Sequence, residues 1–237
     1  MGGGRVPGHL RVGDGSGGTA AHSRKPTAGA TPPPGYKTFK EAVRDRQIVH
    51  LQTTKGRTFI PPVPDAELDL IGGEPHRMRK AAAKKCAELL VAARAALAEK
   101  QGEGDSLAQQ TTLIAVHSAY RPFAEDELSW NQTFDNEYKA MLKNAAYKSD
   151  PLGTAAEDYM FEIMKPLKAP PGYSNHSNGM AVDFKTMHGG TLLKSRKVQR
   201  PAWRKTWLWP WLKKNAKDFD FKPLKSEEWH WDYSPKK

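Results

Sequence analysis

The sequence predicts an α+β domain in which a small, mainly antiparallel sheet is packed by helices. Helix-forming stretches dominate the chain before residue 168, whereas short runs rich in β-branched and aromatic residues gather mainly toward the C-terminus. Helices and strands that are segregated along a chain typically pack as helices on one side of a sheet. The 237 residues are enough for one substantial core or two small ones.

The first 35 residues are expected to form a flexible arm, which leaves one domain at residues 36–237. This arm holds half of the 20 glycines and the sequence TPPPG, with almost no apolar residues. Such a composition cannot bury enough surface to offset the entropy of the chain. The N-terminus lacks the apolar region of a secretory signal, and no run approaches the ~18 apolar residues of a membrane span. We therefore expect export by a non-classical route or release on lysis, if the protein leaves the cell.

The next elements differ in how clearly they are indicated. Residues 46–54 and 57–63 are expected as short extended pieces joined by a turn at KGR. Residues 76–100 have apolar side chains at helical spacing, strong helix formers throughout, and a glycine-containing stop at QGEGD. They predict a long helix.

Two more helices are predicted before the last third of the chain. Residues 123–148 follow Pro122, which suits a turn or the first turn of a helix. Residues 154–167 predict a third helix that ends near a proline. Residues 202–221 predict a late helix that is interrupted or started at Pro210.

Three strands complete the prediction. Residues 111–121 switch to β-branched and apolar side chains, MAVDF at 180–184 reads as a short buried strand, and EEWHWDY at 227–233 reads as a terminal strand. The sequence APPGYSNHSNG ahead of the second strand has the composition of a loop.

Charge and cysteine content limit the classes of function. The chain carries 37 Lys and Arg against 26 acidic residues, a formal net charge of +11, which favours anionic partners. No nucleic-acid motif accompanies this charge, so we expect no nucleic-acid partner. The single cysteine, Cys86, reads as a small buried thiol and excludes an intrachain disulfide. Any metal would have to be held by histidines and carboxylates.

A histidine and an aspartate stand at the two ends of the sequence HSNGMAVD. An unpaired carboxylate in an apolar strand is costly, so Asp183 requires a nearby cation. Hydrolytic zinc takes three protein ligands and leaves one position open, which makes His176 and Asp183 two candidates and His230 the third. Glu227 precedes His230 by three residues, and regular strand alternation would point the two side chains to opposite faces. We therefore expect a turn or bulge near Ser226 that brings Glu227 toward the metal.

These residues resemble a family of zinc peptidases. The motifs are SxHxxGxAxD, which runs from Ser174 to Asp183, and ExxHW, which runs from Glu227 to Trp231. They resemble the VanY-like D-alanyl-D-alanine carboxypeptidases and dipeptidases of vancomycin resistance, which share their fold with the hedgehog signalling domain. HSAYRP is similar to the S-x-Y-R segment of that family, and APPGYS and WLKKNAKDFDF match further segments in order. The resemblance spans roughly residues 65–233.

The resemblance implies a role for each residue of the motifs. One zinc ion per chain would be held by His176, Asp183 and His230. Glu227 would be the general base for the zinc-coordinated water, whose pKa zinc lowers to about 7. Arg121 would stabilise the developing oxyanion or anchor a substrate carboxylate. The expected substrate-side donors are Ser118, Tyr120 and Ser174.

The implied activity is hydrolysis of peptidoglycan stem peptides at the bacterial cell wall or in the periplasm, with removal of a terminal D-alanine. The alternatives are an endopeptidase, as in endolysins or delivered wall-degrading toxins, and a zinc-containing binding module without turnover. Two positions depart from the family pattern. Ser177 stands where a glutamine commonly follows the first metal histidine, and Asp126 stands where a glutamine often lies five positions beyond the arginine. These departures leave the substrate open.

Several candidates have a structural alternative. Glu228 rivals Glu227 as the base, and Arg121 could be an ion-pair partner of Glu125 at helical spacing. His117 is expected as a packed or surface histidine, and His188 as a loop residue. The tract KSRKVQRPAWRKTWLWPWLKK could contact an anionic wall polymer, or its tryptophans could pack the helix onto the sheet while its lysines face water.

Overall fold

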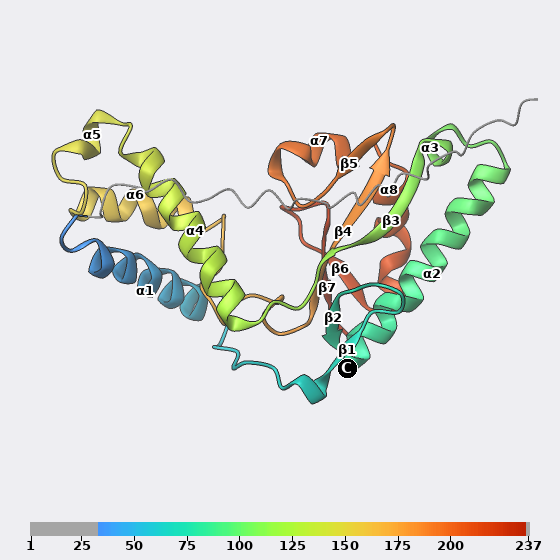
Figure 1. The fold of residues 1–237 in the computed structure, drawn as a ribbon, viewed down its shortest axis with the longest axis horizontal. Helices are drawn as coiled ribbons and strands as arrows, with labels where there is room; N and C mark the ends of the chain where they lie inside the picture. Colours follow the sequence, from blue (N-terminus) through green and yellow to red (C-terminus); the bar gives the residue numbers. More distant parts are fainter. Residues whose placement is uncertain (1–32, 236–237) are drawn as a thin grey trace, which may run out of the picture. The chain divides into compact units, whose positions relative to one another are not determined.

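A five-stranded sheet lies at the centre of the computed structural model, which describes residues 33–235. Residues 1–32 of the predicted arm lie outside this described part, and residues 33–35 fall within it. Four strands follow the order β3-β4-β7-β6, and β5 pairs with β4 (Figure 1). All of these pairings are antiparallel, which confirms the predicted sheet. The strand bounds are β3 Thr111–Ser118, β4 Ala181–His188, β5 Thr191–Leu193, β6 Phe221–Pro223 and β7 His230–Tyr233.

The main hydrophobic core lies between this sheet and helix α2 (Lys80–Gly102). The apolar stripe of α2 includes Cys86 and Leu89, both with no exposed surface, and packs with Val182 and Phe184 of β4. Burial raises the pKa of the Cys86 thiol above its usual range, as expected for an inert core cysteine. A two-stranded sheet precedes α2, with β1 at Leu68–Leu70 and β2 at Arg77–Arg79. The short helices on this side of the chain are η1 Asp65–Glu67 and α3 Ser106–Gln109.

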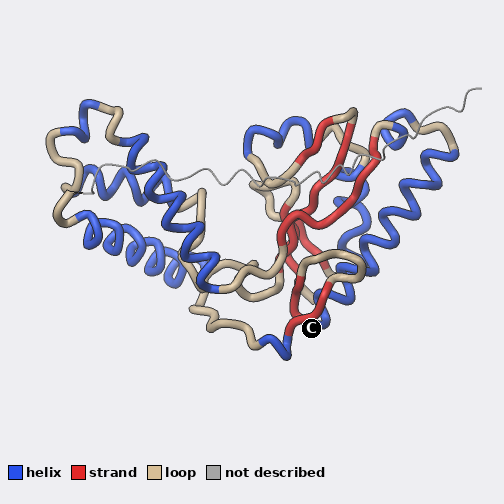
Figure 2. The backbone as a smooth tube through the Cα atoms, viewed as in Figure 1, coloured by secondary structure: helices blue, strands red, loops and turns tan. Residues whose placement is uncertain are grey.

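Three helices form a second hydrophobic core. They are α1 (Tyr36–Lys55), α4 (Phe123–Met141) and α6 (Thr154–Met164), and the short helix α5 (Ala145–Lys148) connects the last two (Figure 2). Trp130 and Phe134 are fully buried in this core, and their rings stack with centroids 5.3 Å apart. The described chain therefore has two cores.

The prediction of extended pieces at residues 46–54 is wrong, because these residues belong to α1. Phe39, Val43 and Gln47 recur at four-residue spacing and are the buried residues of this helix. The β-branched residues of the stretch suggested strands locally, but packing against α4 and α6 decides in favour of the helix. Residues 57–63 form no helix or strand, so their predicted extended strand is absent.

Other boundaries differ by a few residues. The predicted helix over 76–100 begins with β2 at residues 77–79, and the one over 123–148 breaks after Met141. The late helix is divided into α7 (Arg200–Trp203) and α8 (Leu208–Asn215), followed by the 3-10 turn η3 (Ala216–Phe219). A further 3-10 turn, η2, spans Lys197–Gln199.

The tryptophans of the basic tract divide between core and surface. Trp203 and Trp207 are buried in the main core, whereas Trp209 and Trp211 are partly buried beside it. Lys213 lies over the Trp209 ring, 5.7 Å from its centroid. Packing onto the core thus accounts for at least half of these rings. Within residues 33–235, each helix is too short or too polar to cross a lipid bilayer.

Replacement of Phe39 by alanine should lower the free energy of unfolding by about 3–5 kcal/mol, because a buried aromatic ring is deleted from the α1–α4–α6 core. Urea denaturation followed by circular dichroism measures this loss. Val49→Ala is the matched control, since Val49 lies on the same helix with 56% of its surface exposed, and it should change stability by less than about 0.5 kcal/mol. Equal effects of the two variants would show that α1 does not fold as part of this core.

Candidate metal centre and active site

The three expected metal ligands lie on two paired strands and one loop. Asp183 is on β4 and His230 is the first residue of β7, and the two are directly paired in the antiparallel register. His176 belongs to the loop that enters β4 and is placed next to them by its backbone, whose carbonyl accepts hydrogen bonds from the N–H groups of Arg121 and Gly179. All three ligands are buried. They are the one group of three or more His, Cys, Asp and Glu donors of metal-site geometry within residues 33–235.

The donor atoms of this group form a nearly equilateral triangle. His176 Nε2 lies 3.2 Å from His230 Nδ1 and 3.3 Å from Asp183 Oδ1, and the last two atoms are 3.0 Å apart. In a tetrahedral site with metal–ligand distances of about 2.0–2.1 Å, ligand atoms are separated by about 3.3 Å. The triangle therefore fits a tetrahedral zinc ion with a fourth position left open.

The outer ring nitrogens of both histidines are held by acceptors. His176 Nδ1 donates to the carbonyl of Ala119 at 2.7 Å, and His230 Nε2 donates to Asp232 Oδ1 at 2.9 Å. Asp232 is itself oriented by the side-chain amide of Asn175, at 2.8 Å. Because each outer nitrogen donates to a fixed acceptor, the inner nitrogen of each ring faces the centre of the triangle and offers its lone pair once a metal ion replaces any proton there. This arrangement is typical of metal-bound histidines.

The electrostatics of the cluster also favour a cation. Burial alone would raise the pKa of Asp183, but His176 and His230 outweigh it and hold that pKa far below its usual range. Burial alone would lower the pKa of His230, but Asp183 and Asp232 raise it to about 10. Asp183 and Asp232 thus stabilise positive charge in the space between the two imidazole rings. A divalent cation bound there would supply that charge.

The ligand loop depends on glycine at one position. Gly179 has a φ of 65°, and a Cβ there would lie 3.0 Å from the backbone nitrogen of Arg79. That nitrogen donates to the Gly179 carbonyl at 3.0 Å. The tight contact with β2 fixes the loop between His176 and β4.

Glu227 lies in a turn immediately before β7, as predicted. The backbone N–H of Glu227 donates to Leu224, and its carbonyl accepts from the N–H of His230. The side chain lines a cavity of about 440 Å³ together with the three expected metal ligands, and its Oε2 accepts from Trp229 Nε1 at 3.0 Å. Its rival Glu228 is buried elsewhere and accepts from Arg200 and Arg204, each at 2.7 Å. Glu227 is therefore the glutamate that faces the cavity.

Arg121 also lines this cavity, and its ion-pair partner is Asp126 instead of Glu125. Arg121 Nε donates to Asp126 Oδ1 at 3.0 Å, and Nη2 lies 3.4 Å from Ser174 Oγ. Ser177 Oγ donates to the other oxygen of Asp126 at 2.7 Å. The two positions that depart from the family pattern thus contact each other and together orient Arg121.

The expected substrate-side donors differ in whether they line the cavity. Ser174 lines the cavity, whereas Ser118 and Tyr120 are absent from its lining. Ser118 pairs with Asp183 in the register of β3 and β4, and the backbone N–H of Tyr120 donates to Arg77. His188 is the last residue of β4 instead of a loop residue, with Nδ1 3.1 Å from Thr111 Oγ1.

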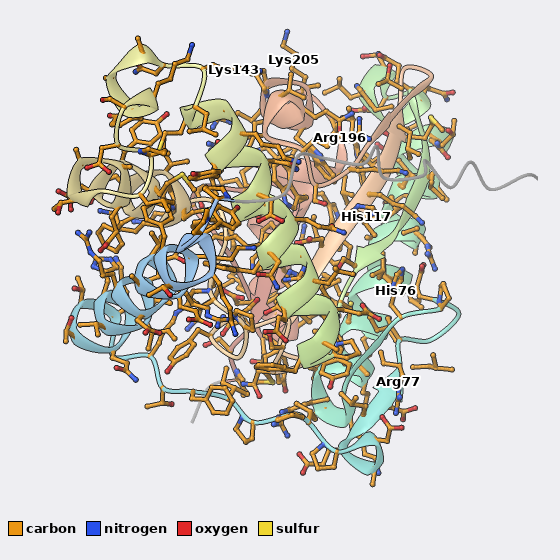
Figure 3. All side chains as sticks on the ribbon, turned by 60° about the vertical axis from the view of Figure 1, so that its left-hand side comes forward. His76, Arg77, His117, Lys143, Arg196 and Lys205 are labelled. Carbon is orange, nitrogen blue, oxygen red and sulfur yellow. The ribbon has the colours of Figure 1, made fainter. Side chains whose placement is uncertain are left out.

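His117 on β3 and His76 in the loop before β2 are labelled in Figure 3, and neither belongs to the metal cluster. Both are half-buried, and burial lowers the pKa of each ring. His117 is therefore a partly packed histidine, as predicted.

Several cavity residues were not predicted from the sequence, among them Asp232, Asn175, Arg57 and Lys168. Asp232 follows His230 by two positions, so strand alternation could have placed both on one face. Asn175, Arg57 and Lys168 carry no comparable signal in the sequence. All four line the cavity.

Residues 75–236 match the family described as VanY, D-alanyl-D-alanine carboxypeptidase. The chain belongs to this family. The match covers more than half of the chain and includes every residue of the cluster. It confirms the predicted family and the expectation that the protein is a hydrolytic enzyme of the zinc peptidase class acting on peptidoglycan.

Three solved structures are similar to the chain in fold. VanYB in complex with D-alanine-D-alanine is 21% identical, with a TM-score of 0.45 and coverage of 75% of this chain and 84% of that chain. The LdcB LD-carboxypeptidase is 21% identical, with a TM-score of 0.47 and coverage of 74% and 71%. A mutant of the vancomycin resistance D,D-pentapeptidase VanY in complex with Zn(II) is 20% identical, with a TM-score of 0.42 and coverage of 73% and 83%. Among curated protein sequences, none matches the chain significantly.

Proposed function

We propose that the protein is a zinc-dependent D,D-carboxypeptidase that removes the terminal D-alanine from peptidoglycan stem peptides. One observation carries the proposal. Two histidines and one carboxylate meet at donor distances of 3.0–3.3 Å, in a cavity that is also lined by Glu227 and Arg121. A ligand triangle with an open corner, an adjacent base and a fixed cation make up the minimal site for metal-assisted hydrolysis of a peptide bond.

The metal ligands are His176, Asp183 and His230. Their nitrogen and oxygen donors and their triangular geometry suit zinc, which is bound this way in hydrolytic sites with three protein ligands. Bound zinc supplies Lewis acidity, which lowers the pKa of a coordinated water and polarises a carbonyl. Asp232 and the Ala119 carbonyl hold the imidazole rings in the orientation that this binding requires.

Glu227 is the general base. The hydrogen bond from Trp229 Nε1 holds its Oε2, which leaves Oε1 to receive a proton from the attacking water. The same carboxyl group can then deliver the proton to the leaving amine. The turn between Leu224 and His230 fixes the backbone of Glu227, so this proton transfer needs little rearrangement.

Arg121 provides positive charge on the substrate side of the cavity. Its guanidinium is held by Asp126 and lies next to Ser174 Oγ. It stabilises the negative charge that develops on the carbonyl oxygen or binds a substrate carboxylate. Ser174 is a hydrogen-bond donor to the substrate.

The test is to incubate the zinc-loaded protein with purified muropeptides that carry pentapeptide stems and to identify the products by mass spectrometry. We expect each stem to become lighter by one alanine residue. Separation of crosslinked stems would instead identify an endopeptidase. A lack of products from protein that contains stoichiometric zinc would favour a binding module without turnover. The metal-stripped protein is the control and should give no product.

We also propose that the enzyme acts at the bacterial wall. The formal net charge of +11 favours contact with anionic wall polymers. The lysines of the 194–214 tract are the candidates for this contact, since two of its tryptophans are buried in the core.

A further inference from the structure

Lys168 is a cation in the cavity wall that the family motifs do not include. It lies in the loop between α6 and His176, and 18% of its side chain is exposed. Burial lowers the pKa of its ammonium group and the neighbouring Arg121 lowers it further, while the carboxylates of Asp126, Asp183 and Glu227 act in the opposite direction. A largely buried ammonium is stable only with an anion close to it.

The described residues do not supply that anion fully. One carboxylate lies within 4 Å of Lys168 Nζ in residues 33–235, namely Asp126, whose Oδ1 is 3.9 Å away. The same oxygen already accepts from Arg121 Nε at 3.0 Å, and the other oxygen accepts from Ser177. Asp126 is completely buried, so it cannot turn to bind a second cation. Lys168 therefore keeps at most a weak partner.

The charges of the contact group formed by Arg121, Asp126 and Lys168 sum to one positive charge; the carboxylates of Asp183 and Glu227 also act on Lys168 but lie more than 4 Å from its ammonium. Arg121 and Lys168 each contribute +1, and Asp126 contributes −1, since its carboxyl group accepts hydrogen bonds from a cation and a hydroxyl. A single carboxylate would neutralise the remainder and would restore a close partner to the ammonium of Lys168. The cluster thus fits a monoanionic carboxylate better than a neutral amide.

The backbone of Lys168 is fixed by helix α1. Gln47 Nε2 donates to the Lys168 carbonyl at 3.2 Å, and Gln47 Oε1 accepts from Trp130 Nε1 at 3.0 Å. Gln47 is buried and lies outside the residues that match the family. The ammonium is therefore presented from a fixed backbone, which reduces the entropy lost when a ligand binds.

We propose that Lys168 is a specificity residue that binds the free C-terminal carboxylate of the stem peptide, and so restricts cleavage to the end of the chain. This inference rests on the proposed peptidase function. In a terminal residue the carboxylate carbon follows the scissile carbonyl by a single residue, within ~3.8 Å. Lys168 lines the same cavity as the expected metal ligands and Glu227, which is the cavity that such a carboxylate would enter. A peptide bond inside the chain is followed by another amide group, so it offers no carboxylate to Lys168.

The test compares three peptides with D-Ala-D-Ala ends: the free acid, its C-terminal amide, and a free acid in which the carboxylate of the γ-linked glutamate is amidated. In Lys168→Met, kcat/KM for the free acid should fall by about 10- to 100-fold, mainly through KM. The amide should be a poor substrate for the wild type and should be unaffected by the substitution. The third peptide should behave like the first, and Lys168→Arg should restore part of the loss.

Lys165→Met is the matched control, because Lys165 also lines the cavity but pairs with Glu162 at 2.7 Å. Zinc content and the thermal midpoint identify any variant that fails to fold. If Lys168→Met lost the same fraction of kcat/KM for the free acid and for the amide, or lost none for either, the inference would be overturned. A loss that depends on the glutamate carboxylate would also overturn it, since Lys168 would then bind that group. A wild type that cleaves no peptide would instead refute the proposed function itself.

Discussion

Replacement of Glu227 by glutamine should lower kcat for the release of alanine by about 10²- to 10⁴-fold, which is the usual contribution of a general base. Glutamine keeps the size of the side chain and can still accept from Trp229, but it cannot take a proton from water. Zinc content should stay at one equivalent per chain, because Glu227 is not among the three ligands. Steady-state kinetics with a stem pentapeptide and metal analysis of the same sample measure both quantities.

Glu228→Gln is the matched control for this experiment. Glu228 is adjacent in sequence but is buried against Arg200 and Arg204. The substitution should lower the thermal midpoint, because two cations lose their anionic partner, while the activity per folded molecule stays near that of the wild type. If Glu227→Gln kept its activity and Glu228→Gln lost it, the assignment of the base would be wrong.

Replacement of His176 by alanine should remove zinc from the purified protein and reduce hydrolysis to the level of the metal-stripped wild type. The substitution leaves two donors, Asp183 and His230, of which the histidine is held by Asp232. A hydrolytic zinc site needs three protein ligands and only two would remain, so the affinity for zinc should fall by several orders of magnitude. Dialysis against a zinc-buffered solution followed by elemental analysis gives the affinity.

His188→Ala controls for the loss of a hydrogen-bonded histidine. His188 lies at the far end of β4 from the metal cluster and contacts Thr111. This variant should retain zinc and activity, with at most a small loss of stability. Retention of stoichiometric zinc by His176→Ala would show that the triangle of donors is not the metal site.

The sequence alone was enough to indicate four candidate site residues that the fold brings to one cavity. The spacing of His176, Asp183, Glu227 and His230 matched a known pattern, and the cost of an unpaired carboxylate in an apolar strand indicated a cation. The turn that brings Glu227 toward the cavity was also predictable, since strict alternation would have turned it away from His230. The α+β class followed from the segregation of helix and strand patterns along the chain.

Helix α1 shows where local patterns fail. Its residues 46–54 include isoleucine and valine, which favour strands locally, yet the segment is helical because Phe39 and Val43 pack against α4 and α6. Those two helices lie about 90 to 120 residues further along the chain. A short stretch of sequence contains no information on such distant contacts, so tertiary packing overrides its local preference.

The substrate side of the cavity shows the same limit. In the sequence, Ser177 and Asp126 were two separate departures from a family pattern. In the fold, Ser177 Oγ lies 2.7 Å from Asp126 Oδ2, and the other oxygen of Asp126 pairs with Arg121. Lys168 carried no signal at all. Linear spacing determines which side chains are available, and it therefore indicated the candidate metal ligands and the candidate base. The partner of each charge is decided only when a loop, a helix and a strand meet, because ion pairing depends on distance in space and on burial.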